Sequence, residues 1–437
     1  MKIHLIGIGG IGVSALAQYY LSKGHEVSGS DLVASEITDF VKKMGVEIFI
    51  GNFAKNIKKD FDLVVHSPAV KENNKELRQA RKFKIKTQSY PEALGDLTTE
   101  YYTIAVAGAH GKSTTTAMIA LVLMEAGLDP TVIVGTKLKE FGGSNFRAGK
   151  SKLLVIEACE YDSSFLYYSP QIAVITNIDK EHLDFFKTFA SVKKAFEKFI
   201  LKLPIEGFLI RNADDINAPV ITEQKFQIKD YSLKQPEAKK IKSILRVPGS
   251  HNVSNALAAL EVARILAIPD KDIFSALSKF NGTWRRFEIL KENKKYTLIS
   301  DYAHHPNEIL AVLTAAREKY KKKNIWCVFQ PHQHQRTYYL FNDFVKTFRS
   351  VPIDKIIITD IYDVAGRETK TINKEVSSKK LVKKIDKGNV IYLAVDKIEN
   401  FVKDNIPENS VLIIMGAGDI YKLAENFRAL WKNATFI

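Results

Sequence analysis

The chain has 437 residues, a formal net charge of +15 and 46% hydrophobic residues. At roughly 100–200 residues per domain, this length predicts two to four domains, and the composition excludes the disordered and fibrous classes. The two cysteines, Cys159 and Cys327, lie too far apart in the sequence for a disulfide framework or a zinc motif, which fits a reducing, cytoplasmic location.

The positive charge and the apolar segments limit the partners that we expect. A basic balance is compatible with nucleic acid, but the lysines are scattered, and the densest runs, 319–323 and 379–384, are typical of solvated helix faces or ends. There is no window of about 18 apolar residues, and the glycine-patterned N-terminus is unlike a signal peptide. We therefore predict no nucleic-acid partner, no membrane partner, and a monomer or homodimer.

Short strands and helices alternate in the first part of the chain. Strands are predicted at 2–8, 26–30 and 63–66, and a helix at 11–22. This alternation predicts a parallel sheet with helices on its faces. We expect a Rossmann-like domain over residues 1–97.

Two further units are predicted after it. The second, over 98–284, has strands at 103–106, 153–157 and 172–176 and helices at 114–125 and 255–266, and it suits a mostly parallel sheet of the P-loop ATPase type. The third, over 285–437, is expected to be Rossmann-like, with strands at 298–301, 325–330, 355–359, 390–393 and 411–415. No linker-like tract appears, so the joints near 97 and 284 are predicted to be short. The fold class is α/β with three domains.

A phosphate-binding loop is predicted between the strand at 103–106 and the helix at 114–125. It comprises Gly108, Ala109, His110, Gly111, Lys112, Ser113 and Thr114. Glycines let backbone N–H groups converge on phosphate oxygens, and the helix N-terminus adds partial positive charge. Lys112 would reach the terminal phosphates of ATP, and the Ser113 hydroxyl would bind Mg²⁺. The loop is the compact G-x-x-G-K-S form; the alternative is a glycine turn without a ligand.

A second glycine cluster follows the first strand. Gly7, Gly9, Gly10 and Gly12 fit G-x-G-x-x-G, and Asp31 follows about 20 residues later. A pyrophosphate can rest on such a helix start, next to Ile11, whether a nicotinamide nucleotide or a UDP-sugar carries it; a tight turn without a ligand is the alternative. Ser67, where the strand at 63–66 ends, is assigned to the same site. Two such openings favour an enzyme that needs both a nucleoside diphosphate substrate and ATP.

Several further motifs accompany the two loops in a fixed order. They are residues 157–165, 176–178, 182–184, 248–256, 285–288, 301–306, 330–332, 336–337 and 415–420. With both glycine loops, they make the chain resemble the Mur ligase family over nearly its whole length. The resemblance implies three domains, for a UDP-sugar, ATP and an amino acid. It implies that L-alanine is joined to UDP-N-acetylmuramate through an acyl phosphate, in peptidoglycan precursor synthesis.

The resemblance also implies roles for individual residues. Lys112, His182, His304 and Arg336 would be catalytic, and Ser113, Glu157 and His182 would hold Mg²⁺, although a lone histidine such as His182 is often structural. The adenine and ribose would meet His251, Asn252 and Asn255, unless Asn252 or Ser250 is only a helix cap. Arg285 or Arg286 would reach the ATP phosphates when the domains close, and Asp301 lies at the carboxyl edge of the third sheet, where ligands bind. Glu160 and Asp162 fit either supporting groups of the metal site or surface carboxylates.

Three departures from the family pattern leave alternatives open. Ala109 stands where threonine is usual, Cys159 where aspartate is usual, and residues 333–335 read Gln-His-Gln where an arginine commonly follows the histidine. The last weakens the assignment to L-alanine, and a recycling ligase that attaches a whole tripeptide is the near alternative. An NAD(P)-dependent oxidoreductase is the remote one, since it gives Lys112 and Ser113 no role. A non-catalytic nucleotide-binding module would not need Lys112, Glu157 and His182.

Overall fold

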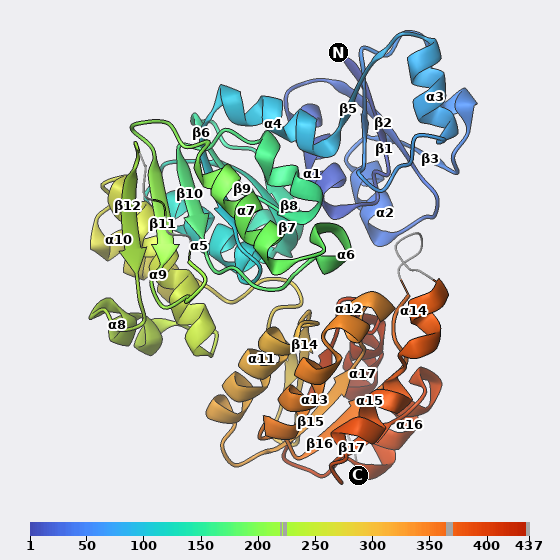
Figure 1. Ribbon diagram of the computed structural model, residues 1–437, viewed down its shortest axis with the longest axis vertical. Helices are drawn as coiled ribbons and strands as arrows, with labels where there is room; N and C mark the ends of the chain where they lie inside the picture. Colours follow the sequence, from blue (N-terminus) through green and yellow to red (C-terminus); the bar gives the residue numbers. More distant parts are fainter. Residues whose placement is uncertain (219–220, 222–224, 364–369, 434–437) are drawn as a thin grey trace. The chain divides into compact units, whose positions relative to one another are not determined.

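The structure is a computed structural model that describes residues 1–218, 221, 225–363 and 370–433. These residues form two compact units. The N-terminal unit comprises Met1–Glu181, Thr188–Ile244 and Ser254–Lys279, and the C-terminal unit comprises His182–Lys187, Leu245–Val253 and Phe280–Ile437. Three sheets are described, two in the first unit and one in the second, each with helices packed on it (Figure 1).

The first sheet is wholly parallel, with the strand order β3-β2-β1-β4-β5. Its elements are β1 (Lys2–Ile6), α1 (Ile11–Ser22), β2 (Glu26–Asp31), α2 (Glu36–Lys43), β3 (Glu47–Ile50), η1 (Ala54–Asn56), β4 (Leu63–His66), α3 (Lys75–Lys82) and β5 (Lys86–Ser89). β1 ends two residues before the predicted limit, because Gly7 turns the chain with φ 82. The predicted helix at 11–22 is confirmed as α1.

The second sheet has the order β12-β11-β10-β6-β9-β7-β8 and is parallel except for the β7–β8 pair. It is reached through α4 (Tyr90–Glu100), which begins with a capping box formed by Ser89 and Glu92. Its elements are β6 (Tyr102–Ala107), α5 (Lys112–Glu125), β7 (Thr131–Leu138), η2 (Lys139–Phe141), β8 (Ser144–Arg147), β9 (Leu153–Glu157), η3 (Tyr161–Tyr167), β10 (Ile172–Ile175), α7 (Phe189–Ile200), β11 (Phe208–Asn212), β12 (Gln227–Tyr231), α8 (Glu237–Ile244), α9 (Ser250–Ile265) and α10 (Asp270–Lys279). The short helix α6 (Leu183–Phe186) comes between β10 and α7 in the sequence but belongs to the C-terminal unit. β6, β9 and β10 are apolar and nearly inaccessible, as expected for central strands covered on both faces.

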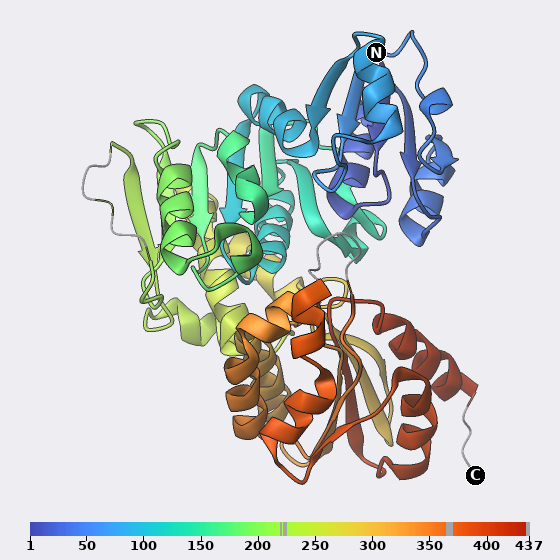
Figure 2. The ribbon, with the colours of Figure 1, turned by 45° about the vertical axis from the view of Figure 1, so that its right-hand side comes forward.

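The third sheet has the order β13-β14-β18-β15-β16-β17, with β13 antiparallel to the rest. Its elements are β13 (Glu288–Glu292), β14 (Tyr296–Asp301), α11 (Pro306–Lys319), β15 (Asn324–Phe329), α12 (His334–Tyr339), α13 (Phe341–Ser350), β16 (Lys355–Ile358), α14 (Lys370–Glu375), α15 (Ser378–Ile385), β17 (Val390–Tyr392), α16 (Val395–Asn405), β18 (Ser410–Met415) and α17 (Tyr421–Asn433). One core lies under α11, α13 and α15 and the other under α16 and α17, so the sheet is covered on both faces (Figure 2).

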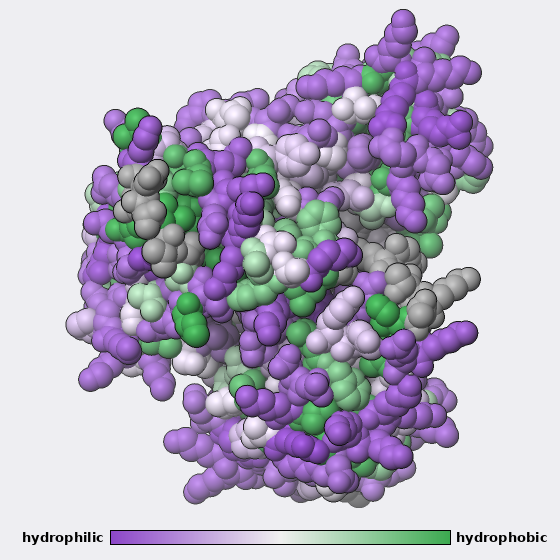
Figure 3. All heavy atoms as spheres, viewed as in Figure 1, coloured by the Kyte–Doolittle hydropathy of each residue, from purple (hydrophilic) through white to green (hydrophobic). Residues whose placement is uncertain are grey.

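The α/β fold class with mostly parallel sheets is confirmed. The predicted joint near 97 falls inside α4, and the one near 284 falls just before β13. The lysines at 321–322, 379–380 and 383–384 are exposed, as expected for solvated helix faces and ends, and hydrophilic residues spread over the visible face of the C-terminal unit (Figure 3). No helix in the described part of the chain is long and apolar enough to cross a membrane.

Candidate functional site

The phosphate loop lies between β6 and α5, against the end of β10. A Cβ on Gly108 (φ 139) would lie 2.0 Å from the Thr176 hydroxyl oxygen, and Gly111 also has a positive φ of 83. Both positions therefore need glycine. Thr176 donates to the His110 carbonyl at 2.6 Å, and the Asn177 side chain accepts from the His110 N–H at 2.9 Å. Thr176 and Asn177 directly follow β10, so the end of this strand holds the loop in position without a ligand.

Lys112 is the first residue of α5, two residues earlier than the predicted helix start. Its ammonium nitrogen lies 3.0 Å from Glu160 Oε2 and donates to the carbonyls of Gly108 and Ala109. Burial lowers the pKa of Lys112, but the neighbouring acidic groups, Glu160 foremost, together outweigh burial and hold the pKa above its ordinary value. The loop therefore carries a fixed positive charge.

Glu160 and Asp162, which the sequence left as either supporting groups of the metal site or surface carboxylates, have different surroundings in the structure. The Glu160 side chain is 1% exposed and pairs with Lys112, so it is an interior group of the site. Asp162 is exposed. The charge on Glu160 is compensated within the protein, which keeps Lys112 in place without a bound phosphate.

Ser113 and Glu157 are brought together as a pair of oxygen groups. The Ser113 hydroxyl donates to Glu157 Oε2 at 2.8 Å, and the Gly135 N–H donates to the same oxygen at 2.8 Å. Hydroxyl and carboxylate oxygens are the ligands that suit Mg²⁺, so this pair fits the implied metal. Burial raises the pKa of Cys159 to about 12. Its thiol is therefore protonated at neutral pH in the metal-free protein.

The other residues assigned to ATP and metal lie in different places. Asn255 of α9 lies against Gly111, where an added Cβ would come within 2.5 Å of Asn255 Oδ1. Asn252 donates to the Pro248 carbonyl at 2.7 Å, inside the first turn of α9. Burial lowers the pKa of His251 to about 4, so its ring is neutral at physiological pH. His182 precedes α6 with φ 56 and belongs to a segment of the C-terminal unit, so its pairing with Ser113 and Glu157 stays a prediction.

The N-terminal glycine loop lies over a pocket of about 540 Å³. Asp31 holds the loop, because its Oδ2 accepts from the Gly9 N–H at 2.8 Å. Of the residues predicted for a UDP-sugar, Gly7, Gly10, Asp31 and Ser67 line the pocket. Gly9, Ile11 and Gly12 are not among the lining residues. Gly12 serves packing, since a Cβ there would lie 2.8 Å from Cζ of Tyr90.

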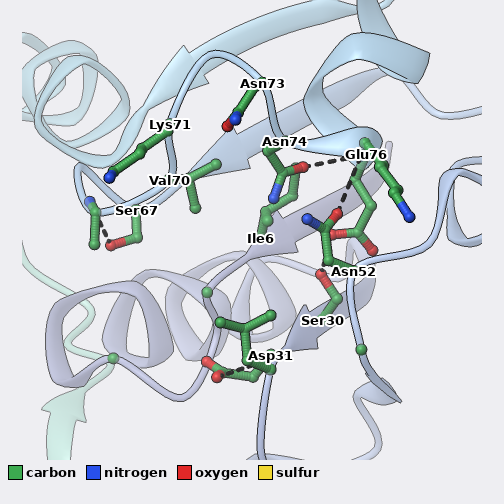
Figure 4. Close-up of a pocket in the computed structure, with 16 residues that line it drawn as sticks. Ile6, Ser30, Asp31, Asn52, Ser67, Val70, Lys71, Asn73, Asn74 and Glu76 are labelled. Atoms are coloured by element: carbon green, nitrogen blue, oxygen red, sulfur yellow. Dashed lines mark hydrogen bonds between the residues drawn. The ribbon is translucent and has the colours of Figure 1, made fainter. Parts of the chain in front are cut away.

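The rest of the pocket wall was missed from the sequence. Figure 4 shows Ser67 and Lys71 on one side of the pocket and Asn52 and Glu76 on the other, with Asn73 and Asn74 above. Glu76 is buried and accepts from the Ser30 hydroxyl at 2.7 Å and from the Asn56 amide at 2.6 Å. The sequence feature that could have indicated this part of the wall is Asn74. It is a helix-capping residue after a strand end, and its side chain accepts from the Glu76 and Leu77 N–H groups.

The segment before β13 lies beside the turn after β14, because the Tyr302 N–H donates to the Arg285 carbonyl at 2.7 Å, and it gives the two neighbouring arginines different surroundings. Arg285 is 4% exposed and donates to the carbonyls of Gly416 and Gly418. Asp301 is 2% exposed and accepts from the N–H groups of Phe287 and Ala303, each at 2.7 Å, and burial raises its pKa to about 6. Both side chains bind the backbone of their own unit, and the assignment of Arg285 and Asp301 to ATP stays a prediction. Arg286 is the better candidate.

Arg286, His304 and Arg336 belong to one cluster of side chains in the C-terminal unit. Glu308 lies 3.5 Å from Arg286 Nη1 through one oxygen and 3.4 Å from His304 Nδ1 through the other. Arg336 Nη1 lies 3.1 Å from His332 Nδ1, and the His304 and His332 rings are 5.9 Å apart. The predicted pair His304 and Arg336 is thus brought together through His332 at the carboxyl edge of the third sheet.

These features define the class of protein. In the N-terminal unit, a phosphate loop with a charged lysine lies beside a serine–glutamate pair, and a second glycine loop lies over a pocket. Residues 2–102 match the Mur ligase family, catalytic domain; residues 106–244 match the Mur ligase middle domain; and residues 285–418 match the Mur ligase, glutamate ligase domain. The chain belongs to the Mur ligase family.

Relatives and solved structures give a finer comparison. The chain is 42% identical over 451 residues to the UDP-N-acetylmuramate–L-alanine ligase of Clostridium tetani, covering 98% of this chain and 97% of that one. It is 40% identical over 448 residues to the enzyme of that name from Clostridium kluyveri, covering 97% of each. The crystal structure of UDP-N-acetylmuramate-alanine ligase MurC from Thermotoga maritima matches with a TM-score of 0.80 at 28% identity over 99% of each chain. A murein peptide ligase from Psychrobacter arcticus shares the fold, with a TM-score of 0.72 at 23% identity over 100% of each chain.

Proposed function

We propose that this chain joins L-alanine to UDP-N-acetylmuramate with conversion of ATP to ADP and phosphate. The observation that carries the proposal is the pairing of Lys112 with Glu160 and of Ser113 with Glu157 at the start of α5. It occurs in a chain that is 42% identical, over 98% of its length, to a relative named for this reaction.

The proposed reaction has two steps. An oxygen of the lactyl carboxylate attacks the γ-phosphorus of ATP, the bond to the bridging oxygen breaks, and ADP leaves. The amino group of L-alanine then attacks the acyl carbon, the bond to the phosphate oxygen breaks, and phosphate leaves as the nitrogen loses its proton. Carboxylate and triphosphate repel each other, so fixed positive charge is needed to bring them together.

The N-terminal unit supplies groups for the first step. Lys112 stays protonated beside Glu160, 3.0 Å away, and is placed to turn toward phosphate oxygens. Ser113 and Glu157 would hold Mg²⁺, which when bound neutralises charge on the ATP phosphates. The backbone of Gly7 and Gly10 is assigned to the UDP pyrophosphate, with Asp31 fixing the loop.

The C-terminal unit supplies groups for the second step. Arg286 is assigned to the phosphates of ATP, and His304 and Arg336 are assigned to the amino acid and the tetrahedral intermediate. Glu308 contacts both Arg286 and His304, so it orients the two together. His251, Asn252 and Asn255 remain assigned to the adenosine.

We also propose that the protein is cytoplasmic and acts as a monomer or homodimer without a nucleic-acid partner. The lysines at 379–380 and 383–384 are exposed on α15, and those at 321–322 are exposed after the end of α11. Light scattering on the purified chain, with and without UDP-N-acetylmuramate, measures the oligomeric state.

A substrate panel tests the function. The protein is incubated with UDP-N-acetylmuramate, ATP and Mg²⁺ together with L-alanine, glycine, L-serine or the tripeptide of the recycling ligases. ADP release is measured, and the product is identified by mass spectrometry. We expect release with L-alanine and a product heavier by one alanine residue. Release driven by the tripeptide and not by L-alanine would replace this proposal with the recycling activity.

A further inference from the structure

The β7–β8 hairpin has an irregular register beside the metal-binding pair. Ile133 faces Phe146 and Leu138 faces Ser144. Residues 134–137 of β7 are therefore opposite the single residue Asn145 of β8. Such bulges re-aim backbone groups and are frequent next to active sites.

The bulged strand touches Glu157. The Gly135 N–H donates at 2.8 Å to Glu157 Oε2, the oxygen that also accepts from the Ser113 hydroxyl. A Cβ on Gly135 would lie 2.7 Å from this oxygen and 2.9 Å from Oε1. The bulge thus fixes the orientation of the carboxylate at the ATP site, and only glycine permits that approach.

The opposite strand of the hairpin, β8, forms hydrogen bonds to α1. Asn145 Nδ2 donates to the Ile11 carbonyl in the first turn of α1, and Asn145 Oδ1 accepts from Gln18 Nε2 at 2.9 Å. The Ser144 hydroxyl donates to Gln18 Oε1 at 2.7 Å. Gln18, Ser144 and Asn145 are 2%, 6% and 4% exposed.

These contacts lie at the start of the helix on which the N-terminal glycine loop rests, because α1 begins directly after Gly10. Apolar packing tolerates small displacements of one element against another. Buried amides that satisfy each other accept one arrangement, since a shift leaves a donor or acceptor unpaired. The hairpin therefore has one fixed position against α1 and one fixed contact with Glu157.

We infer that Asn145 and Gln18 are positioning residues that couple the UDP-sugar loop to the metal-binding carboxylate of the ATP site. The inference rests on the proposed function, which places a nucleotide on each loop. Neither residue lines the pocket of the N-terminal glycine loop, and neither belongs to the phosphate loop. A nucleotide on one loop restricts α1 or Glu157, and the hairpin transmits that restriction to the other.

Calorimetry on the full chain tests the coupling. The affinity for UDP-N-acetylmuramate is measured with and without Mg²⁺ and a non-hydrolysable ATP analogue, and the reciprocal pair is measured as a check, because coupling between sites is symmetric. We expect roughly a 5-fold or larger change in wild type, the lower range for allosteric pairs. In Asn145→Leu and Gln18→Met the ratio falls toward one, kcat falls, and KM for L-alanine is unchanged.

Control variants separate positioning from general destabilisation. Gln171 Oε1 accepts from the Thr103 N–H at the start of β6, away from the carboxyl edge of the same sheet. Gln171→Leu removes a comparable polar contact and should leave the coupling ratio at the wild-type value. Ser144→Ala removes the hydroxyl that Gln18 and the Phe146 N–H use, and it gives a milder test should the larger changes impair folding.

The outcomes distinguish the two proposals. Both ligands binding to wild type without coupling, or full coupling retained in Asn145→Leu, Gln18→Met and Ser144→Ala, would overturn this inference and leave the proposed function standing. No binding of UDP-N-acetylmuramate to the wild type would overturn the proposed function and the inference with it.

Discussion

The loops at residues 7–12 and 108–113 both carry the chain from a buried parallel strand into a helix, yet they are held differently. In the first, the anchor is a side chain from the next strand, Asp31, whose carboxylate accepts from the Gly9 N–H at 2.8 Å. In the second, Gly108 has φ 139 and leaves no room for a Cβ beside Thr176, and Lys112 forms an ion pair with Glu160. The first loop contains no charged side chain, and the second contains a buried ion pair.

The turn after β14 gives a third case. It too ends a parallel strand, but Asp301 is turned inward and binds backbone groups of its own unit, as does Arg285 from the segment before β13. Charged residues near the ends of strands therefore have three roles in this chain. Asp31 anchors a loop, Lys112 is held in a compensated ion pair, and Asp301 stabilises a turn. The position of a residue in the sheet does not by itself identify a ligand contact.

The largest expected effect is that of replacing Lys112 in the loop at residues 108–113. In Lys112→Met, turnover should fall by roughly 10³-fold or more, because the fixed charge opposite the developing phosphate charge is lost. Affinity for UDP-N-acetylmuramate should be unchanged, since the first loop does not use this lysine. Turnover is measured by ADP release and affinity by calorimetry. Near-normal turnover would remove the lysine from the mechanism.

The same variant has a second consequence. Glu160, 1% exposed, is left buried without its cation, and breaking a buried pair costs about 3–5 kcal/mol. Lys112→Met with Glu160→Gln should recover much of the melting temperature and none of the turnover. Recovery of turnover in this double variant would contradict a catalytic role for the charge.

The different contacts of Arg285 and Arg286 predict opposite phenotypes for their substitution. Arg286→Met should lower kcat by roughly 10²-fold with a small change in melting temperature, because it removes a cation proposed to act on phosphate. Arg285→Met should lower the melting temperature, because the carbonyls of Gly416 and Gly418 lose their donor. Kinetics and thermal melts on both variants check this, and reversed phenotypes would exchange the two assignments.

Alanine substitutions compare strain in the two loops. Gly108→Ala should raise KM for ATP by roughly 10-fold or more, since a residue forced into an unfavourable backbone region costs about 1–3 kcal/mol and its Cβ would lie 2.0 Å from Thr176 Oγ1. Gly10, by contrast, has φ −73, and a Cβ added there would lie 3.3 Å from the nearest atom, the Gly7 carbonyl oxygen. We therefore compare Gly10→Ala with Gly108→Ala. The kinetics of Gly10→Ala should stay within a few-fold of wild type. Equal effects at both positions would show that the loops are held alike.

The anchor of the first loop predicts a smaller and more selective effect. In Asp31→Ala the Gly9 N–H loses its acceptor, and a hydrogen bond to a charged group contributes about 1.5–3 kcal/mol. KM for UDP-N-acetylmuramate should rise roughly 10-fold while KM for ATP is unchanged. Asp60→Ala, which removes an exposed carboxylate paired with Lys2, serves as the control. A rise in KM for ATP alone would place Asp31 in the other site.

The smallest predicted effect is the pH dependence of stability at Asp301. Its folded pKa is raised by burial to about 6, above an unfolded value of about 3.9. The folded state therefore binds the proton more tightly between these values, and this group adds stability as pH falls from 7 to 5. The expected gain is about 1 kcal/mol. Urea unfolding at both pH values should show the gain in wild type and its loss in Asp301→Asn; an unchanged difference would mean that the carboxyl is not perturbed.

Much of the fold was predictable, and the misses have physical reasons. β1, β4, β6, β9, β10, β14, β15, β16 and β18 were found because interior strands of a parallel sheet are continuous apolar runs. β17 lies at an edge of the third sheet, and it was also predicted. β12 and β13 were missed, because these edge strands are charged and half-exposed. The β7–β8 hairpin was missed as well, since Gly135 and the bulge interrupt its pattern.

By itself, the sequence determined the α/β class, the two glycine loops and the Mur ligase family, because each depends on residues close together in the chain. Only the tertiary structure decided that Glu160 is buried against Lys112, that Arg285 rather than Arg286 builds the turn, and that Asn145 binds α1. In each case the deciding partner is more than 40 residues away in the chain or on another element. Whether a charged side chain faces a ligand or its own backbone depends on that partner.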